Sequence, residues 1–309
     1  MQAETTVDAR ARRFELSPQA FRRLAFAGAV ALFLIVASGA TVRLTASGLG
    51  CEHWPGCAPG HPFPEKDHHA FIEFGNRVVS ALTIGATLLV WLGSLRTPGL
   101  TRSTRWLAFA TFFGTLAQAP LGAITVYADL HPLLVMTHFL LALAVLGAGV
   151  LLVLRAVQLE VGAAVTKTPT IVRRGALVLA GAALVMVVTG TFATAAGPHP
   201  GGEDVRRLWT LYDAVYLHVR GTAVFGMTFL VVLVWLWRRR AVYPRLLEAG
   251  FLVLGLLLLQ MMVGELQYRT ELPWWLVLVH VSLAAAVWAA VVAFASLLRD
   301  PPASMAPVD

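Results

Sequence analysis

The sequence predicts an all-α integral membrane protein whose eight transmembrane helices form two similar four-helix bundles. Hydrophobic residues make up 58% of the 309 residues and charged residues only 13%, whereas a soluble domain usually carries about 25% charged residues. Apolar runs recur along most of the chain, and many reach the length of about 20 residues that crosses a bilayer. Several polar residues also repeat at one fixed sequence offset. Together these observations leave no room for a soluble domain of ordinary size.

The apolar runs define the elements in order. The expected spans are 24–42, 70–95, 106–127, 132–154, 175–195, 211–237, 246–268 and 273–298. They group into an N-terminal half, 24–154, and a C-terminal half, 175–298, which a polar linker, 155–174, separates. The first 23 residues are polar, and the apolar run after them is too long for a signal peptide. We therefore expect 1–23 and the tail 299–309 to stay in the cytoplasm.

The distribution of Lys and Arg supports this orientation. Seventeen of the 24 basic residues lie in the N-terminal segment, in alternate loops and in the tail, and seven lie in or near the remaining loops. Cytoplasmic loops of membrane proteins carry such an excess, so both termini are expected inside. The formal net charge of +7 reflects this orientation and does not indicate nucleic-acid binding. The N-terminus lacks a Ser-rich organellar transit sequence, which favours a bacterial plasma membrane.

The first outer loop, about 43–69, contains both cysteines of the chain. Cys51 and Cys57 would face an oxidising compartment, where a disulfide can form. Such a bond could be structural or redox-active, and the structural role is favoured. A metal site that uses His53 and His61 is a weaker alternative.

An internal repeat relates the two halves. At an offset of 142 residues, the matching pairs are Gln118 and Gln260, Gly122 and Gly264, His138 and His280, and Asn76 and His218. These matches extend without a gap across 62 residues, and they involve polar residues at similar depths in the spans. Because many membrane proteins are built from repeats with ligands bound between elements, we expect two four-helix halves of the same orientation.

Histidines inside the spans indicate haem binding. An ionisable residue within a membrane is costly and usually functional. His218 and His280 lie on the second and fourth helices of their half, where two imidazoles can ligate a haem iron from both sides. A pair of hydrogen-bonded packing histidines is the alternative, and zinc is disfavoured because further ligands are lacking. In the first half His138 matches His280, but Asn76 replaces the second ligand and leaves that face open.

Three charged residues near these positions are candidates for the same sites. Glu73 lies three residues before Asn76, so both side chains share one helix face. It can act as a proton acceptor or stabilise positive charge on a substrate; the alternative is a helix-end Glu paired with Arg77. Arg77 and Arg220 can bind haem propionates, or they can contact lipid headgroups.

These residues resemble the haem A synthase family. The resemblance is carried by the loop Thr45–Cys57, by Glu73–Arg77, which is similar to the family's Glu-x-x-His-Arg motif, and by Gln118–Val126 with the three histidines. It covers nearly the whole chain. Two departures are Asn76, where many members have His, and the absence of a cysteine pair from the third outer loop.

The resemblance implies an enzyme that oxidises the C8 methyl of haem O to the formyl of haem A by successive hydroxylations. It implies haem b on His218 and His280, haem O on His138, and a catalytic role for Glu73. Haem O synthase would supply the substrate and cytochrome oxidase would receive the product. The alternatives are a cytochrome b-like electron carrier, which should have equivalent ligands in both halves, and a haem transporter or chaperone.

Overall fold

The structure is a computed structural model, and it describes residues 15–51, 53, 54, 56, 57, 60, 63, 64, 67–162, 168–202, 205–302 and 305. Within these residues it contains eight long helices and no β-strand. The helices are α2 (Pro18–Leu44), α3 (His68–Arg96), α4 (Arg102–Tyr127), α5 (Pro132–Val161), α6 (Thr170–Ala196), α7 (Leu211–Arg238), α8 (Pro244–Arg269) and α9 (Trp274–Arg299). Each is long and apolar enough to cross a membrane, which confirms the predicted all-helical membrane protein.

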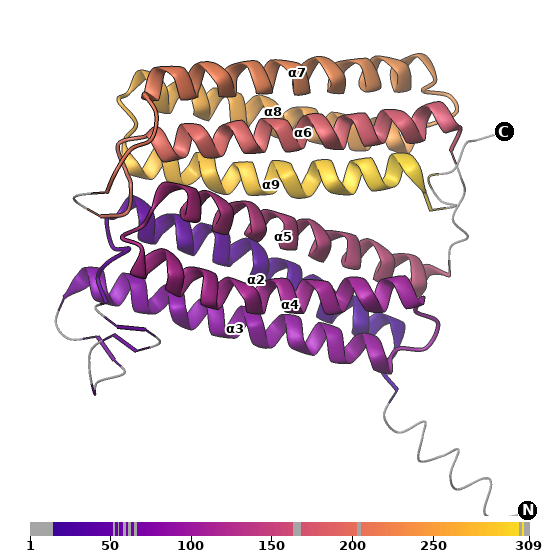
Figure 1. Ribbon diagram of the computed structural model, residues 1–309. Helices are drawn as coiled ribbons and strands as arrows, with labels where there is room; N and C mark the ends of the chain where they lie inside the picture. Colours follow the sequence, from indigo (N-terminus) through magenta and orange to yellow (C-terminus); the bar gives the residue numbers. More distant parts are fainter. Residues whose placement is uncertain are drawn as a thin grey trace, which may run out of the picture.

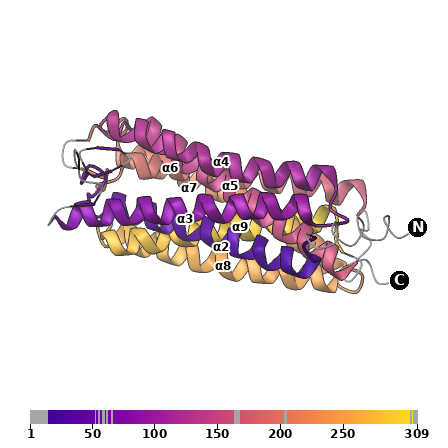
Figure 2. The same ribbon diagram turned by 90° about the horizontal axis from the view of Figure 1, so that it is seen from below.

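The eight helices lie side by side as two sets of four (Figure 1). In the first set, α2 and α4 each pack against both α3 and α5, so the four helices close into a ring. In the second set, α6 and α8 each pack against both α7 and α9. The view from below shows the helices running roughly parallel along the length of the molecule (Figure 2). The descent of both sets from one repeat, and their orientation in a membrane, stay predictions.

The two sets meet through α5, which packs against α6 and α9, and through α2, which packs against α9. A hydrogen bond fixes this contact: the indole N–H of Trp288 donates to the backbone carbonyl of Leu143 at 2.7 Å. Gly147 makes room for the indole, because a Cβ at this position would lie 3.2 Å from Trp288 Nε1. The interface therefore has a defined register in the middle of the bundle.

The helices extend beyond the expected spans by several residues. The span expected to end at residue 154 continues as α5 to Val161, and Gly162, with a left-handed φ of 61°, follows as its C-cap. The expected span that begins at residue 70 starts as α3 at His68, because the Asp67 side chain accepts a hydrogen bond from the backbone N–H of His69. Hydropathy marks where apolar residues end, whereas a helix ends where a cap stops its hydrogen bonds.

The surface of the bundle is apolar over much of its length. Large hydrophobic side chains such as Leu252, Val231 and Leu82 are between 69% and 77% exposed. A contiguous apolar surface of this kind marks a face that contacts another apolar phase rather than water. The interior is packed with Leu, Val, Phe and Ala in both sets. This arrangement suits a multi-pass membrane protein.

Candidate functional site

A cavity of about 600 Å³ lies inside the first set of four helices. Its walls come from all four of these helices and from residues of α6 and α9. Pro200, Gly201, Val205 and Arg206, which follow α6, also line it. Most of its surface is apolar, with a few polar side chains. The polar and charged residues that line it include Arg43, Glu73, Asn76, Arg77, Ser80, Thr83, Thr115, Gln118, Thr125, His138, Thr191, Thr194 and Arg206. An apolar pocket of this volume with a few convergent polar groups is typical of a small-molecule or cofactor site.

His138 projects into this cavity from α5. Its imidazole packs against Gly122 of α4, where an added Cβ would lie 3.4 Å from the ring Cε1. The amide of Gln118 donates a hydrogen bond to the backbone carbonyl of His138 at 3.1 Å. The buried Nδ1 of His138 has no hydrogen-bond partner among the described residues. The ring is therefore held in place by packing rather than by a hydrogen bond to Nδ1.

Asn76 lines the same cavity from α3. Its side-chain Oδ1 accepts a hydrogen bond from the hydroxyl of Ser38 on α2 at 2.9 Å. The structure thus brings Asn76 and His138 to one cavity, as their repeat-related positions predict. Whether either residue contacts a haem stays a prediction.

Glu73 lies one turn before Asn76 and is only 4% exposed. One carboxylate oxygen accepts a hydrogen bond from the backbone N–H of Cys51 at 2.8 Å. The other lies 2.5 Å from Nη2 of Arg77. Glu73 also lines the cavity. The carboxylate is thus paired with Arg77, as one alternative drawn from the sequence expects, and its catalytic role stays a prediction.

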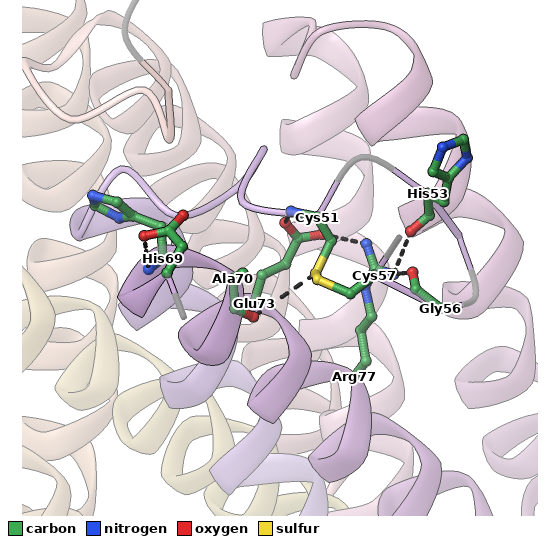
Figure 3. The surroundings of a disulfide bond; sticks show 9 residues. Cys51, His53, Gly56, Cys57, His69, Ala70, Glu73 and Arg77 are labelled. Carbon is green, nitrogen blue, oxygen red and sulfur yellow. Dashed lines mark hydrogen bonds and ion pairs between the residues drawn. A yellow bond between two sulfur atoms is a disulfide. The ribbon is translucent and has the colours of Figure 1, made fainter. Parts of the chain in front are cut away.

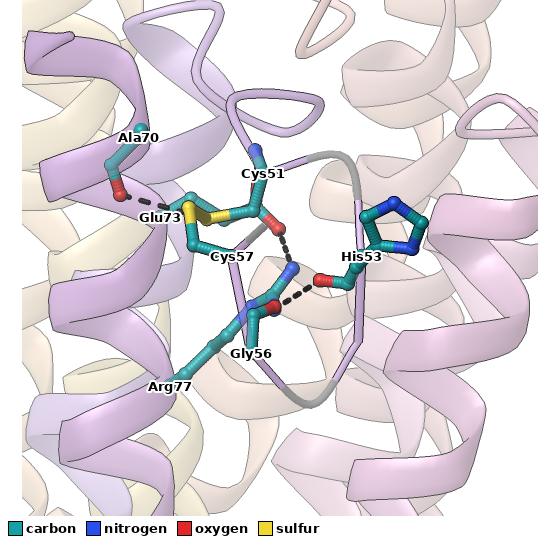
Figure 4. Close-up of polar contacts among 7 residues, drawn as sticks. All are labelled: Cys51, His53, Gly56, Cys57, Ala70, Glu73 and Arg77. Atoms are coloured by element: carbon teal, nitrogen blue, oxygen red, sulfur yellow. Dashed lines mark hydrogen bonds and ion pairs between the residues drawn. A yellow bond between two sulfur atoms is a disulfide. The ribbon is translucent and has the colours of Figure 1, made fainter. Parts of the chain in front are cut away.

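Cys51 and Cys57 form a disulfide, as Figure 3 shows beside Glu73 and Arg77. Arg77 holds the backbone of the enclosed loop, because its guanidinium donates to the carbonyl of His53 at 2.7 Å and to that of Gly56. Figure 4 shows these contacts from a second direction. The disulfide loop, the acid and the arginine therefore form one connected structure at the edge of the cavity.

The weaker alternative, a metal site in this loop, cannot be followed, since His61 lies outside the described residues. The part of the chain that the structure describes contains no cluster of three His, Cys, Asp or Glu side chains suited to a metal ion. His53 contributes its backbone carbonyl to the loop.

The second set of helices repeats part of this arrangement around His280. Gln260 donates to the backbone carbonyl of His280 at 3.1 Å, as Gln118 does to His138. The same amide nitrogen lies 3.2 Å from Nε2 of His280. Gly264 faces the ring, and an added Cβ would lie 3.0 Å from its Cε1.

His218 lies on α7 against the small residue Gly190 of α6. A Cβ on Gly190 would lie 3.1 Å from Cε1 of the imidazole. Nδ1 of His218 lies 3.3 Å from the hydroxyl oxygen of Thr189. Both histidines of the second set thus pack their rings on glycines, which leaves the positions of the imidazoles sensitive to any added side chain.

The two arginines expected near the haem sites differ in environment. Arg77 lines the cavity, although its described hydrogen bonds go to the disulfide loop and to Glu73. Arg220 is exposed on α7, where its guanidinium stacks on the ring of Tyr216. It is not among the described residues that line the large cavity.

Two further arginines, Arg43 and Arg206, line the cavity and were not singled out from the sequence. In the sequence both count only among the seven basic residues in or near the remaining loops. The fold brings both to one cavity because the segment after α6 packs beside the end of α2: the backbone N–H of Gly48 donates to the carbonyl of Gly201 at 2.9 Å. Sequence alone gives no signal for this contact between halves.

Comparison with known proteins places this architecture in a family. A family model described as "Cytochrome oxidase assembly protein" (COX15-CtaA) matches residues 22–292. The chain is 40% identical over 124 residues to a protein named heme A synthase from Symbiobacterium thermophilum, an alignment that covers 39% of this chain and 40% of that protein. It is 33% identical over 129 residues to the heme A synthase of Lysinibacillus sphaericus, covering 41% and 42% of the two chains.

A third relative aligns over a longer stretch. The heme A synthase of Shewanella oneidensis is 25% identical over 286 residues, which covers 78% of this chain and 85% of that protein. The alignments with the first two relatives span about two fifths of those proteins. Because the family model matches most of the sequence, the chain belongs to the COX15-CtaA family of cytochrome oxidase assembly proteins.

Proposed function

We propose that the chain is a haem A synthase, which oxidises the C8 methyl group of haem O to a formyl group by successive hydroxylations. The observation that carries this proposal is the cavity of about 600 Å³ in the first set of helices, into which His138 and Glu73 both face. Its apolar walls suit a porphyrin, and an imidazole is a common axial ligand of haem iron. The relatives named heme A synthase support the same activity.

In this proposal each residue of the first set has a distinct role. His138 ligates the iron of haem O and so fixes the macrocycle in the cavity. Asn76, held by Ser38, leaves the opposite face of the macrocycle without a strong ligand. Glu73 accepts a proton or stabilises positive charge as the methyl group is oxidised, and Arg77 holds its carboxylate in position.

The second set of helices is proposed to hold haem b between His218 and His280. Two observations support this fit. The imidazoles come from α7 and α9, two helices of the second set, and both imidazoles pack on glycines rather than on bulky side chains. Nε2 of His280 contacts Gln260, a hydrogen bond that an iron atom would replace. Haem b, when bound, supplies one-electron redox chemistry.

The proposal includes a cellular setting. Both haem sites would lie near the outer face of a bacterial plasma membrane, with both termini in the cytoplasm. Haem O synthase would provide the substrate, and cytochrome oxidase would receive haem A. The family description, which names cytochrome oxidase assembly, supports this product acceptor.

The test is a pigment analysis of the purified full-length protein after co-expression with a haem O synthase. Extraction and chromatography should yield haem b together with haem O and haem A. Haem b alone would favour a membrane electron carrier instead. A colourless protein would favour a transporter and would contradict the proposed activity.

A further inference from the structure

We propose that Arg43 and Arg206 form a carboxylate-binding site at the edge of the large cavity, and that this site holds the propionate groups of the substrate haem. This inference rests on the proposed function, because it names the part of the substrate that the two arginines recognise. Arg43 belongs to the last turn of α2, and Arg206 to the segment between α6 and α7. Both residues line the cavity.

Arg43 is a cation in the wall of a membrane-spanning bundle. Its guanidinium donates through Nη2 to the backbone carbonyl of Thr194 on α6, while its buried Nε has no hydrogen-bond partner among the described residues. The stem packs on the segment after α6, because a Cβ on Gly201 would lie 3.6 Å from Cγ of Arg43. The side chain is therefore fixed in position, and the bond to Thr194 is the one hydrogen bond of its guanidinium among the described residues.

No carboxylate of the described residues balances this charge. The ion pairs of Arg and Lys in the described part of the chain join Arg22 to Glu160, Arg77 to Glu73, and Arg269 to Glu265. Neither Arg43 nor Arg206 takes part in one of them. Among the described residues that line the cavity, Glu73 is the one acid, and it already pairs with Arg77. A partly buried cation without an anion is costly, so an anionic ligand would stabilise the site.

The neighbouring basic residue has a different role. Arg207 donates to the backbone carbonyls of Val205 and Pro198, at 2.8 and 3.3 Å, so its guanidinium fixes the fold of the segment. Arg206 is exposed beside it and faces the cavity instead. The segment thus has one arginine that holds its backbone and one that is available to a ligand.

The shape of the cavity identifies the class of ligand. Its surface is mostly apolar, and its lining includes Arg43 at the end of α2 and Arg206 from the segment after α6. A ligand that fits has a large apolar body and carboxylates at one edge, because arginine binds carboxylates through two parallel hydrogen bonds. A porphyrin with propionate groups has this distribution. The site would also make substrate binding depend on both sets of helices.

The experiment compares haem O with its dimethyl ester, in which both propionates are neutral. Each compound is titrated into the purified full-length protein that already carries haem b, and binding is followed by the visible difference spectrum. For the wild-type protein the ester should bind on the order of a hundredfold more weakly, since each charged hydrogen-bonded pair contributes about a tenfold factor or more. The double variant Arg43→Gln/Arg206→Gln should bind the two compounds with nearly equal affinity.

Control variants keep the result interpretable. Arg269→Gln removes an exposed arginine that pairs with Glu265 at the same end of the bundle, and it should discriminate between acid and ester as the wild type does. Arg206 is exposed, so the single variant Arg206→Gln remains usable if Arg43→Gln prevents folding. In this variant the ratio of the affinities for haem O and its ester should fall about tenfold. Arg43→Lys should keep part of the preference for the acid over the ester. Lysine retains the positive charge but lacks the planar guanidinium group that binds a carboxylate through two hydrogen bonds.

Two results would overturn the proposal. In one, the wild type binds the ester as tightly as the acid, which would mean that the arginines do not hold the propionates. In the other, the double variant discriminates as strongly as the wild type. Failure of the proposed function would look different: haem O would bind, and no haem A would be formed by the wild type.

Discussion

The carboxylate of Glu73 accepts a hydrogen bond from the backbone N–H of Cys51 at 2.8 Å, so an acid that lines the cavity is tied directly to the disulfide loop. Arg77 closes the same arrangement from the other side, because it binds both Glu73 and two carbonyls of that loop. The position of the carboxylate therefore depends on the loop. Mutation of Glu73 itself and mutation of the two cysteines therefore test different contributions: the first removes the acid, and the second loosens the loop that positions it.

Glu73→Gln should abolish haem A formation while haem b is retained. The amide can still accept the hydrogen bond from Cys51, but it can neither take up a proton nor stabilise positive charge, and such roles contribute about 100-fold or more to a rate. Extracted pigments measure the outcome. The matched control is Glu265→Gln, which removes an exposed acid of an equivalent i,i+4 ion pair. Wild-type amounts of haem A in the Glu73 variant would remove this residue from the mechanism.

The double variant Cys51→Ser/Cys57→Ser should lower haem A formation without eliminating it. A cross-link that closes so short a loop stabilises it by about 2 kcal/mol in the chain-entropy view, and Arg77 still holds the loop carbonyls after its loss. Activity assays of the double variant against the wild type measure the effect. Complete loss of activity in a folded protein that still binds haem O would instead indicate a redox-active disulfide.

Much of the fold follows from the sequence, because long apolar runs in a membrane protein have few structural alternatives. The grouping of His138, Asn76 and Glu73 also follows from the sequence. The repeat offset and the helix periodicity predict that these residues belong to one site in the first half. Arg43 and Arg206 could not be found in this way. Their place in the lining of one cavity depends on the packing of the segment after α6 beside the end of α2, and long-range contacts of that kind leave no pattern in a single sequence.

Gly264→Ala should weaken haem b binding severalfold. The new Cβ would lie 3.0 Å from Cε1 of His280, closer than ordinary van der Waals contact, so the imidazole must move away from its ligating position. The haem b content of the purified protein measures the change. Gly255→Ala is the control on the same helix, since its Cβ would meet nothing within 4 Å and the helix propensity gained is equal. Equal haem b content in both variants would contradict the placement of haem b at His280.

Asn76→His should give the first set a second imidazole opposite His138. Asn76 occupies the position that matches His218 at the repeat offset, and its side chain lines the cavity. Two-sided ligation converts the bound iron to a low-spin state, which electron paramagnetic resonance detects after haem O is added. Asn76→Gln should leave the spin state unchanged. An unchanged spectrum in the histidine variant would show that residue 76 does not face the iron.

The central claim is a division of labour, in which the first set of helices oxidises its haem and the second set retains one. The most direct measurement is the pigment content of His138→Ala and His280→Ala, each purified after co-expression with haem O synthase. His138→Ala should keep haem b but contain no haem A, whereas His280→Ala should lose haem b. Loss of haem b from His138→Ala, or normal haem A formation by it, would contradict this division of labour.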